Sequence, residues 1–183
     1  MLLNMPYLLS RIAYARDEQA YKSVFLHFHP GLFRFCISII KDAESAEEIV
    51  SDILLKVWSM ESGLSYINDI QAYLFKAVRN ASLTWLSREK MKWLSLDEAG
   101  QKFTEITAET MYVNTETGWE IERAISGLPQ QCQLVFRLAK QEGLSYKQIT
   151  SILEISQNTI ESHMRTALRR IRQQLQEYLA DKK

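Results

Sequence analysis

The chain has 183 residues with 22 basic and 22 acidic side chains, so its formal net charge at pH 7 is zero. Apolar residues make up 46% of it, which is enough for one packed domain or two small ones. A free-standing DNA-binding protein is expected to be basic, so this balance implies either no DNA binding or a second molecule that supplies part of the affinity.

Charge is unevenly distributed along the chain. The net charge is +1 over residues 1–92, −5 over residues 93–123 and +4 over residues 124–183. This distribution is consistent with two end modules and an acidic joint. Alternating apolar and polar runs are absent from the sequence, so we expect an all-α fold built from two small helical domains.

The cysteines and histidines offer no candidate catalytic or metal site. Cys36 and Cys132 stand in apolar stretches without metal-ligand spacing, so we expect buried thiols in a reducing compartment. His27 and His29 are two residues apart, which points them to different sides of a helix. The sequence also has no Glu-flanked His pair, Gly-rich phosphate loop or Cys pair. These observations favour a protein that is not an enzyme and that uses no metal or cofactor.

The N-terminal apolar stretch lacks the features of a targeting segment. Asn4, Pro6 and Ser10 interrupt it, and no basic segment precedes it. No stretch of the sequence approaches the length needed to cross a bilayer. We therefore expect a cytoplasmic protein with no direct membrane insertion.

Helical periodicity predicts four helices in the N-terminal half. Asp17 is a suitable N-cap for the first helix, and we expect His29-Pro30-Gly31 to end it. The later helices are predicted over residues 32–40, from a capping box at Ser45 and Glu48 to about Met60, and from about Asp69 to Arg88.

The third and fourth of these helices each have an apolar side. The third is expected to turn polar residues outward, namely Glu47, Glu48, Ser51, Asp52 and Lys56. The fourth is expected to bury Tyr73, Leu74, Ala77, Val78 and Ala81. Because Tyr73 and Trp85 recur at helical spacing, we interpret them as core residues rather than as platforms for stacked bases.

Between Met91 and Gly118 the periodicity breaks up, and acidic residues are scattered among isolated apolar ones. We interpret this segment as a linker with room for short helical turns. Its acidity suits a segment that keeps off DNA or threads a basic channel. Beyond it, Pro129 and Gly143 bracket a scaffold helix with Cys132 and Val135 on its inner side.

The stretch from Leu144 to Arg172 predicts a helix-turn-helix. Ser145 and Gln148 form a capping box at the start of a short helix. A three-residue turn follows, and Ser156 is a good N-cap for a second helix that begins at Gln157. So short a turn joins only an angled pair of helices, which is the arrangement of DNA-binding helix-turn-helix motifs.

The second helix of this pair has one apolar and one polar face. Its apolar face is predicted to contain Ile160, Met164, Ala167, Leu168, Ile171 and Leu175. Amides and a hydroxyl lie near its N-terminus, where a recognition helix contacts base edges, and guanidinium groups suited to phosphates follow. These candidate DNA contacts are Ser156, Gln157, Asn158, Thr159, Glu161, Ser162, Arg165 and Arg169. The alternative is a solvated amphipathic helix, which two consecutive capped helices disfavour.

The C-terminal motifs resemble those of the extracytoplasmic-function (ECF) sigma factors of bacterial RNA polymerase. Leu128-Pro129, Gly143-Leu144-Ser145-Tyr146 and Ile155-Ser156 with Thr159, Ile160 and Ser162 are similar to the leucine-proline, "GLSYEEIA" and "S-x-x-T-V-K-S" patterns of that family. The chain departs at Glu161 and His163, where the family often has lysine and arginine. These departures concern base preference rather than fold.

The N-terminal half resembles the same family. Residues 46–50 and 54–58 are similar to "AEDLVQEVFLKVW", and residues from Ala72 to Leu86 to "AWLYRIARNLALDWLR". The resemblance implies region 2 over residues 1–90, a linker over 91–118 and region 4 over 119–183. It also implies that Glu47, Glu48, Asp52 and Lys56 contact the polymerase clamp helices, and that Tyr66, Asn68, Lys76, Arg79 and Asn80 contact the downstream promoter element.

The partners implied by the resemblance are core RNA polymerase, through its clamp helices and flap, promoter DNA, and a membrane-linked anti-sigma factor. For a melted strand, a loop over residues 61–68 that carries Tyr66 would supply an aromatic neighbour. Two alternatives stay open from the sequence. They are a helix-turn-helix regulator that acts without polymerase, and a sigma mimic that titrates an anti-sigma factor.

Overall fold

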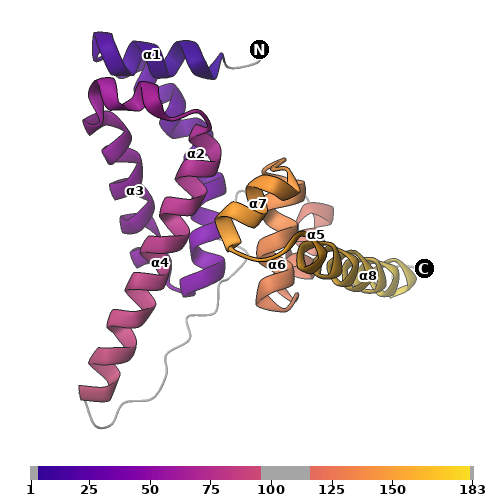
Figure 1. Ribbon diagram of the computed structural model, residues 1–183. Helices are drawn as coiled ribbons and strands as arrows, with labels where there is room; N and C mark the ends of the chain where they lie inside the picture. The colour runs from indigo at the N-terminus through magenta and orange to yellow at the C-terminus, as the bar shows by residue number, and fades with distance from the viewer. Residues whose placement is uncertain (1–3, 96–115, 182–183) are drawn as a thin grey trace.

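The computed structural model describes residues 4–95 and 116–181, and every element in these ranges is a helix (Figure 1). The two-domain, all-α prediction is therefore confirmed. The N-terminal domain contains α1 (Met5–Ala15), α2 (Glu18–Ile40), α3 (Ala43–Ser59), the 3-10 helix η1 (Glu61–Tyr66) and α4 (Ile70–Ser95). The C-terminal domain contains α5 (Glu116–Ser126), α6 (Gln130–Phe136), the π-helical turn η3 (Arg137–Gln141), α7 (Tyr146–Leu153) and α8 (Gln157–Asp181).

The two ends of the predicted linker are helical. Helix α4 continues to Ser95, beyond the expected end near Arg88, and α5 begins at Glu116. Residues 96–115 of the linker lie outside the described residues. Before the start of α4, residues 61–66 form the 3-10 helix η1 rather than an open loop.

The prediction that a helix ends at His29-Pro30-Gly31 is wrong, because α2 runs unbroken through all three residues. Pro30 removes one helical hydrogen bond, whose acceptor would be the carbonyl of Leu26. Leu26 is 62% exposed, so this carbonyl belongs to the outer side of the helix, where water can replace the missing donor. Apolar side chains on both sides of the proline are buried in one core, and this packing outweighs the local cost.

Helix α3 begins three residues earlier than predicted. Asp42 is its N-cap, and the Asp42 carboxylate accepts a hydrogen bond from the backbone nitrogen of Ser45 at 2.8 Å. The predicted capping box at Ser45 and Glu48 is therefore wrong. Asp42 and Ser45 are both good capping residues, and the sequence pattern alone does not distinguish two caps one turn apart.

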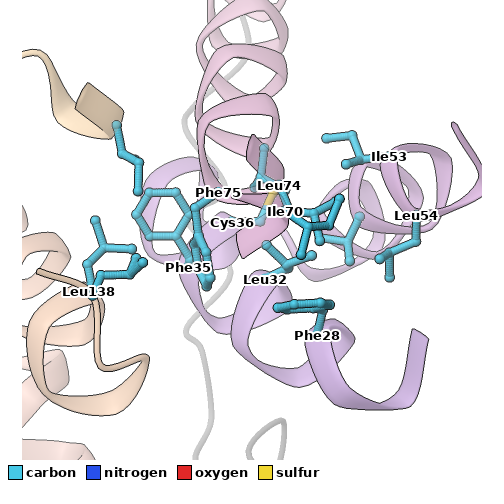
Figure 2. Packing of buried hydrophobic residues seen from close by; sticks show 14 of the residues in the cluster. Phe28, Leu32, Phe35, Cys36, Ile53, Leu54, Ile70, Leu74, Phe75 and Leu138 are labelled. Atoms are coloured by element: carbon cyan, nitrogen blue, oxygen red, sulfur yellow. The ribbon is translucent and has the colours of Figure 1, made fainter. Parts of the chain in front are cut away.

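One apolar core runs from the N-terminal domain into the C-terminal domain. Phe35 of α2 and Phe75 of α4 meet edge to face with ring centroids 5.3 Å apart. Figure 2 shows Leu138 of the C-terminal domain beside the Phe35 ring, and Leu138 is completely buried. Ile149, Ile152 and other buried side chains of α7 belong to the same cluster. The two domains are therefore packed against each other by apolar contacts.

A smaller core lies within the C-terminal domain alone, where α5, α6 and α8 meet. Beside it, Arg137 is 1% exposed and forms an ion pair with Glu122, while donating to the Gln141 side chain at 2.8 Å. A charge so deeply buried needs such partners, since desolvating it alone would be very costly. Periodicity gave no sign of this buried arginine.

Both cysteines are buried, as predicted. Burial raises the pKa of the Cys36 thiol to about 11, and its hydrogen bond with Ser82 acts in the opposite direction. The expectation that no stretch approaches membrane-spanning length is wrong for α2, which is long and apolar enough by length and composition to cross a bilayer, but 56% of its most apolar window is buried inside the protein. Core helices share this composition.

Candidate nucleic-acid and protein interfaces

The helix-turn-helix has the caps that the sequence predicts. The backbone nitrogen of Gln148 donates to the Ser145 hydroxyl at 3.3 Å, and the backbone nitrogen of Ser145 donates to the Gln148 side chain at 2.8 Å. Glu154 adopts the left-handed conformation, with φ 57°, and ends α7. The Ser156 hydroxyl then accepts from the backbone nitrogen of Thr159 at 3.1 Å at the start of α8. These local hydrogen bonds define where α7 and α8 begin.

The first half of α8 presents an uninterrupted polar face. The Gln157 amide donates to the Glu161 carboxylate at 3.3 Å, so these two side chains orient each other. Thr159 is half-buried, and its hydroxyl lies 2.8 Å from that of Ser156, so both residues serve mainly as caps. The candidate side chains that the structure brings together in solvent are Gln157, Asn158, Glu161, Ser162, Arg165 and Arg169.

The cationic part of this face continues along α8. Arg165, Arg169 and Arg172 border a shallow hollow of about 420 Å³, together with Leu168 and two glutamines. Leu168 is 46% exposed, so the apolar face predicted for this helix is buried only in part. It lies between the buried side and the arginine side, and its aliphatic chain can pack along the stems of the arginines. The arrangement offers several guanidinium groups to a row of phosphates.

His163 does not belong to the polar face. It is half-buried, and its Nδ1 atom lies 3.5 Å from the sulfur of Cys132 on α6. His163, one of the two residues that depart from the family pattern, therefore faces the scaffold helix α6. Of the two departures, only Glu161 is exposed among the candidate base contacts.

A second polar surface lies on η1 and α4. Tyr66 is 84% exposed on η1, and Asn68 is exposed in the connection to α4. Lys76 and Asn80 are exposed on α4, four residues apart on one face. The structure thus places four of the five predicted downstream residues in solvent on neighbouring elements.

Tyr73 belongs to this surface and was missed by sequence reasoning. It is 36% exposed rather than buried, so the interpretation of Tyr73 as a core residue is wrong. Its spacing of three and seven residues from Lys76 and Asn80 places it in the same row, which was the available signal. Trp85, by contrast, is half-buried and packs against the core, as expected.

A cavity of about 790 Å³ opens beside η1, between α1, the middle of α2 and the beginning of α4. Asn68 and Asp69 line it on one side, and Leu9, Tyr14 and Phe28 are among its apolar residues. A pocket with apolar walls and a few polar groups at its edge suits a planar, hydrogen-bonding group such as a base.

Arg79 is not free in this arrangement. It is half-buried, and its guanidinium donates to the backbone carbonyl of Leu153 at 3.3 Å and pairs with the Glu154 carboxylate at 3.2 Å. Both partners are at the end of α7 in the C-terminal domain. Arg79 therefore differs from the other four predicted downstream residues, because it is paired with the C-terminal domain.

The outer side of α3 is charged and open. Glu48, Asp52 and Lys56 are exposed, whereas the exposed Glu47 has a partner, because its carboxylate lies 2.8 Å from His29 Nε2 on α2. Leu55 is 54% exposed among these charges and was not predicted as an interface residue. An apolar side chain centred in a polar patch is a common anchor of protein interfaces.

No group of three or more His, Cys, Asp or Glu side chains in residues 4–95 and 116–181 is placed to hold a metal ion. The exposed surfaces described above instead suit binding to polyanions and to another protein.

Comparisons with known proteins divide the chain as the two helical domains do. Residues 24–91 match the family described as Sigma-70 region 2, and residues 119–171 match Sigma-70, region 4. The chain is 26% identical over 171 residues to the ECF RNA polymerase sigma factor RpoE of Cereibacter sphaeroides, covering 87% of this chain and 88% of that protein. It is 24% identical over 183 residues to the ECF RNA polymerase sigma factor SigK of Mycobacterium bovis, covering 90% of each.

Among solved structures, the fold is similar to the sigma factor RpoE in its complex with the anti-sigma factor NepR from Bartonella quintana. The TM-score is 0.60 at 22% sequence identity, over 85% of this chain and 96% of that one. At this identity the likeness shows a shared fold.

Proposed function

The chain belongs to the sigma-70 family, in its ECF group of RNA polymerase sigma factors, and from this premise we propose how its surfaces divide the work of promoter recognition. As a sigma factor it directs core polymerase to promoters and initiates transcription. The observation that carries the proposal is the presence, on one chain, of an open charged surface on α3 and an open polar face on a capped recognition helix.

The first half of α8 reads the upstream promoter element. Gln157, Asn158 and Glu161 are placed for base edges in the major groove, where amides pair with adenine and carboxylates accept from cytosine. Arg165 and Arg169 follow on the same face and contact phosphates. The capped turn before α8 is what holds these side chains in register.

The row on α4 and η1 binds the downstream element. Lys76 and Asn80 contact the strand that is being opened, while Tyr66 and Tyr73 offer exposed rings for stacking. The cavity beside Asn68 is large enough to receive a base that leaves the stack. Tyr73 is an addition to the residues that the sequence motifs indicate.

The outer side of α3 docks on the clamp helices of the polymerase, and the C-terminal domain contacts the flap. Glu48, Asp52 and Lys56 supply charge complementarity, and the exposed Leu55 supplies an apolar anchor beside them. Glu47 contributes less, since His29 already occupies its carboxylate.

A protein that works with polymerase and promoter DNA acts in the cytoplasm, has no catalytic residues of its own and uses no cofactor. An anti-sigma factor is the regulatory partner we propose, by analogy with the related sigma factor that is described in complex with an anti-sigma factor. The expectation that this partner is membrane-linked rests on the family resemblance alone.

Run-off transcription tests the proposal. Core polymerase with the purified chain should produce promoter-specific transcripts from templates selected out of a randomised library, and core polymerase alone should not. A regulator that acts without polymerase would bind those templates tightly by itself at physiological salt. A sigma mimic would bind an anti-sigma factor and give no transcript. Either result would overturn the assignment as an active sigma factor.

The polymerase surface is tested by Asp52→Arg, which reverses an exposed charge without touching the core. Association with core polymerase should fall at least tenfold in a pull-down titration, with an unchanged melting curve. The matched control is Glu18→Arg, a charge reversal at an exposed position of α2 outside the proposed polymerase surfaces, which should leave association unchanged. Equal losses in both variants would count against a docking surface on α3.

A further inference from the structure

Leu83 is an exposed apolar side chain on α4 that none of the surfaces described above uses. It is 45% exposed, whereas Leu74 and Val78 on the same helix are completely buried. Among the described residues, Leu83 belongs to neither apolar cluster, although Ala81 and Leu86 near it pack against the larger one. A single exposed leucine is common on protein surfaces, so its place on the helix decides what it can do.

Leu83 continues the row of exposed side chains on α4 that contacts DNA in the proposed function. It follows Lys76 by seven residues and Asn80 by three, and these spacings put the three side chains on one face of the helix. Thr84 is exposed at the next position, but its hydroxyl already donates to the Asn80 backbone carbonyl at 2.9 Å. The row therefore changes from a cation and an amide to an apolar end at Leu83.

An apolar side chain in such a row matches one feature of the DNA major groove. Thymine presents its C5-methyl group there and apolar side chains contact it, whereas the other base edges offer hydrogen-bond donors and acceptors. Three residues advance an α-helix by about 4.5 Å, close to the rise of about 3.4 Å between successive bases on one strand. Leu83 is therefore spaced to meet the base next to the one that Asn80 contacts, on the side away from the cavity at the beginning of α4.

We propose that Leu83 is a specificity residue of the downstream DNA surface, and that it selects thymine by packing on the C5-methyl group next to the base that Asn80 contacts. The proposal rests on the assignment of α4 to the downstream element made above. Burial of one methyl group corresponds to about fourfold in affinity. Because the contact involves no charge, it should persist at high salt, whereas a phosphate contact of Lys76 weakens.

Deoxyuridine tests this contact directly, because uracil has the hydrogen-bonding groups of thymine and lacks only the methyl. Selection by holoenzyme from a library randomised in the downstream element first identifies the position at which Leu83→Ala, unlike the parent chain, no longer prefers thymine. Deoxyuridine at that position should weaken promoter binding by parent holoenzyme about fourfold, and binding by Leu83→Ala holoenzyme not at all. The same ratio is expected at two salt concentrations.

Leu26→Ala is the matched control, because Leu26 is 62% exposed on α2 and is not part of the DNA or polymerase surfaces proposed above. It should keep both the thymine preference and the fourfold methyl effect. Leu83→Met keeps an apolar side chain and should retain most of that effect. Melting curves check that the three variants are folded, as the exposure of both leucines leads us to expect.

Two results would overturn the proposal on the DNA side. They are the absence of any thymine preference in the parent selection, and an equal loss from deoxyuridine with the parent and with Leu83→Ala. Weaker association of Leu83→Ala with core polymerase would also overturn it, since Leu83 would then be a protein contact.

Asn80→Ala distinguishes a failure of this proposal from a failure of the assignment of α4. If Leu83 fails but Asn80→Ala changes the preferred downstream sequence, the assignment is retained. An unchanged downstream preference in both Asn80→Ala and Lys76→Ala would refute the assignment as well.

Discussion

The two DNA surfaces of this sigma factor differ in how they are held. The recognition face of α8 depends on caps within a few residues of one another, such as Ser156 with Thr159, and its polar side chains are open to solvent. The surface on α4 shares a helix with contacts from the other domain, and Arg79 is bound by residues about 75 positions away in sequence. The recognition face of α8, the upstream reader, is therefore preformed. The surface on α4 and η1, the downstream reader, depends on the arrangement of the domains.

The largest effect should come from removing the support of the preformed reader. Ile125 is 2% exposed in the small core that α5, α6 and α8 share. We expect Ile125→Ala to lower the free energy of unfolding of the C-terminal domain by about 2–5 kcal/mol, measured by chemical denaturation. Ile121→Ala on the same helix is the control, because Ile121 is 40% exposed and should cost less than about 1 kcal/mol. Similar costs for both would refute the small core.

Base contacts on α8 should have the next largest effect. Changing Asn158 or Gln157 to alanine should alter which upstream sequence the holoenzyme prefers, by about 1–3 kcal/mol for a good pair. Arg165→Ala should instead weaken binding about equally across upstream sequences, as expected of a phosphate contact. Selection from a library randomised in the upstream element distinguishes the two behaviours. An unchanged preference in the Gln157, Asn158 and Glu161 variants alike would contradict the assignment of α8.

The same contrast explains what the sequence could predict. The capping box at Ser145 and Gln148 and the cap at Ser156 involve residues three apart, so their chemistry is legible in the sequence, and the structure contains all of them. Helical periodicity also places most of the core correctly. Local patterns therefore predict the fold class, the helix-turn-helix and the exposed polar face of α8.

Where the sequence misleads, a distant contact decides the outcome. Pro30 and Gly31 read as a helix end, but buried side chains on both sides of them keep α2 continuous, and the Glu142 carboxylate from the other domain lies over Gly31. Arg79 reads as a DNA contact, yet it is paired across the domain interface. Tyr73 has helical spacing to apolar and to polar neighbours alike, so periodicity does not fix its side of the helix.

The difference between the two DNA surfaces predicts different results for two neighbouring cations on α4, Lys76 and Arg79. In the isolated chain, Lys76→Ala should weaken binding of a single-stranded 12-mer about threefold, because Lys76 is exposed and free to contact the strand. Arg79→Ala should cause no such loss, because Arg79 is already engaged by α7. Anisotropy titrations at two salt concentrations check this, and a loss for Arg79→Ala as large as that for Lys76→Ala would contradict the difference.

The smallest effect concerns the thiols, one in each domain core. The raised pKa of Cys36, about 11, keeps its thiolate fraction very low at pH 8, and burial also blocks access. Burial raises the pKa of Cys132 as well. We expect negligible alkylation of both by iodoacetamide in the native chain at pH 8, and full alkylation in denaturant, measured by mass spectrometry. Rapid native labelling of either would mean that its core opens readily.

The central claim is that the upstream reader is preformed, whereas the downstream reader, with Arg79 held by the C-terminal domain in the free chain, is complete only in the polymerase complex. Footprinting of one selected promoter by the isolated chain and by holoenzyme tests this most directly. The account predicts weak, salt-sensitive protection of the upstream element by the chain alone, since a neutral chain gains little from counterion release. Holoenzyme should protect both elements, with affinity raised roughly 10²–10⁴-fold by coupling the two contacts. Strong protection of both elements by the chain alone at physiological salt would contradict the account.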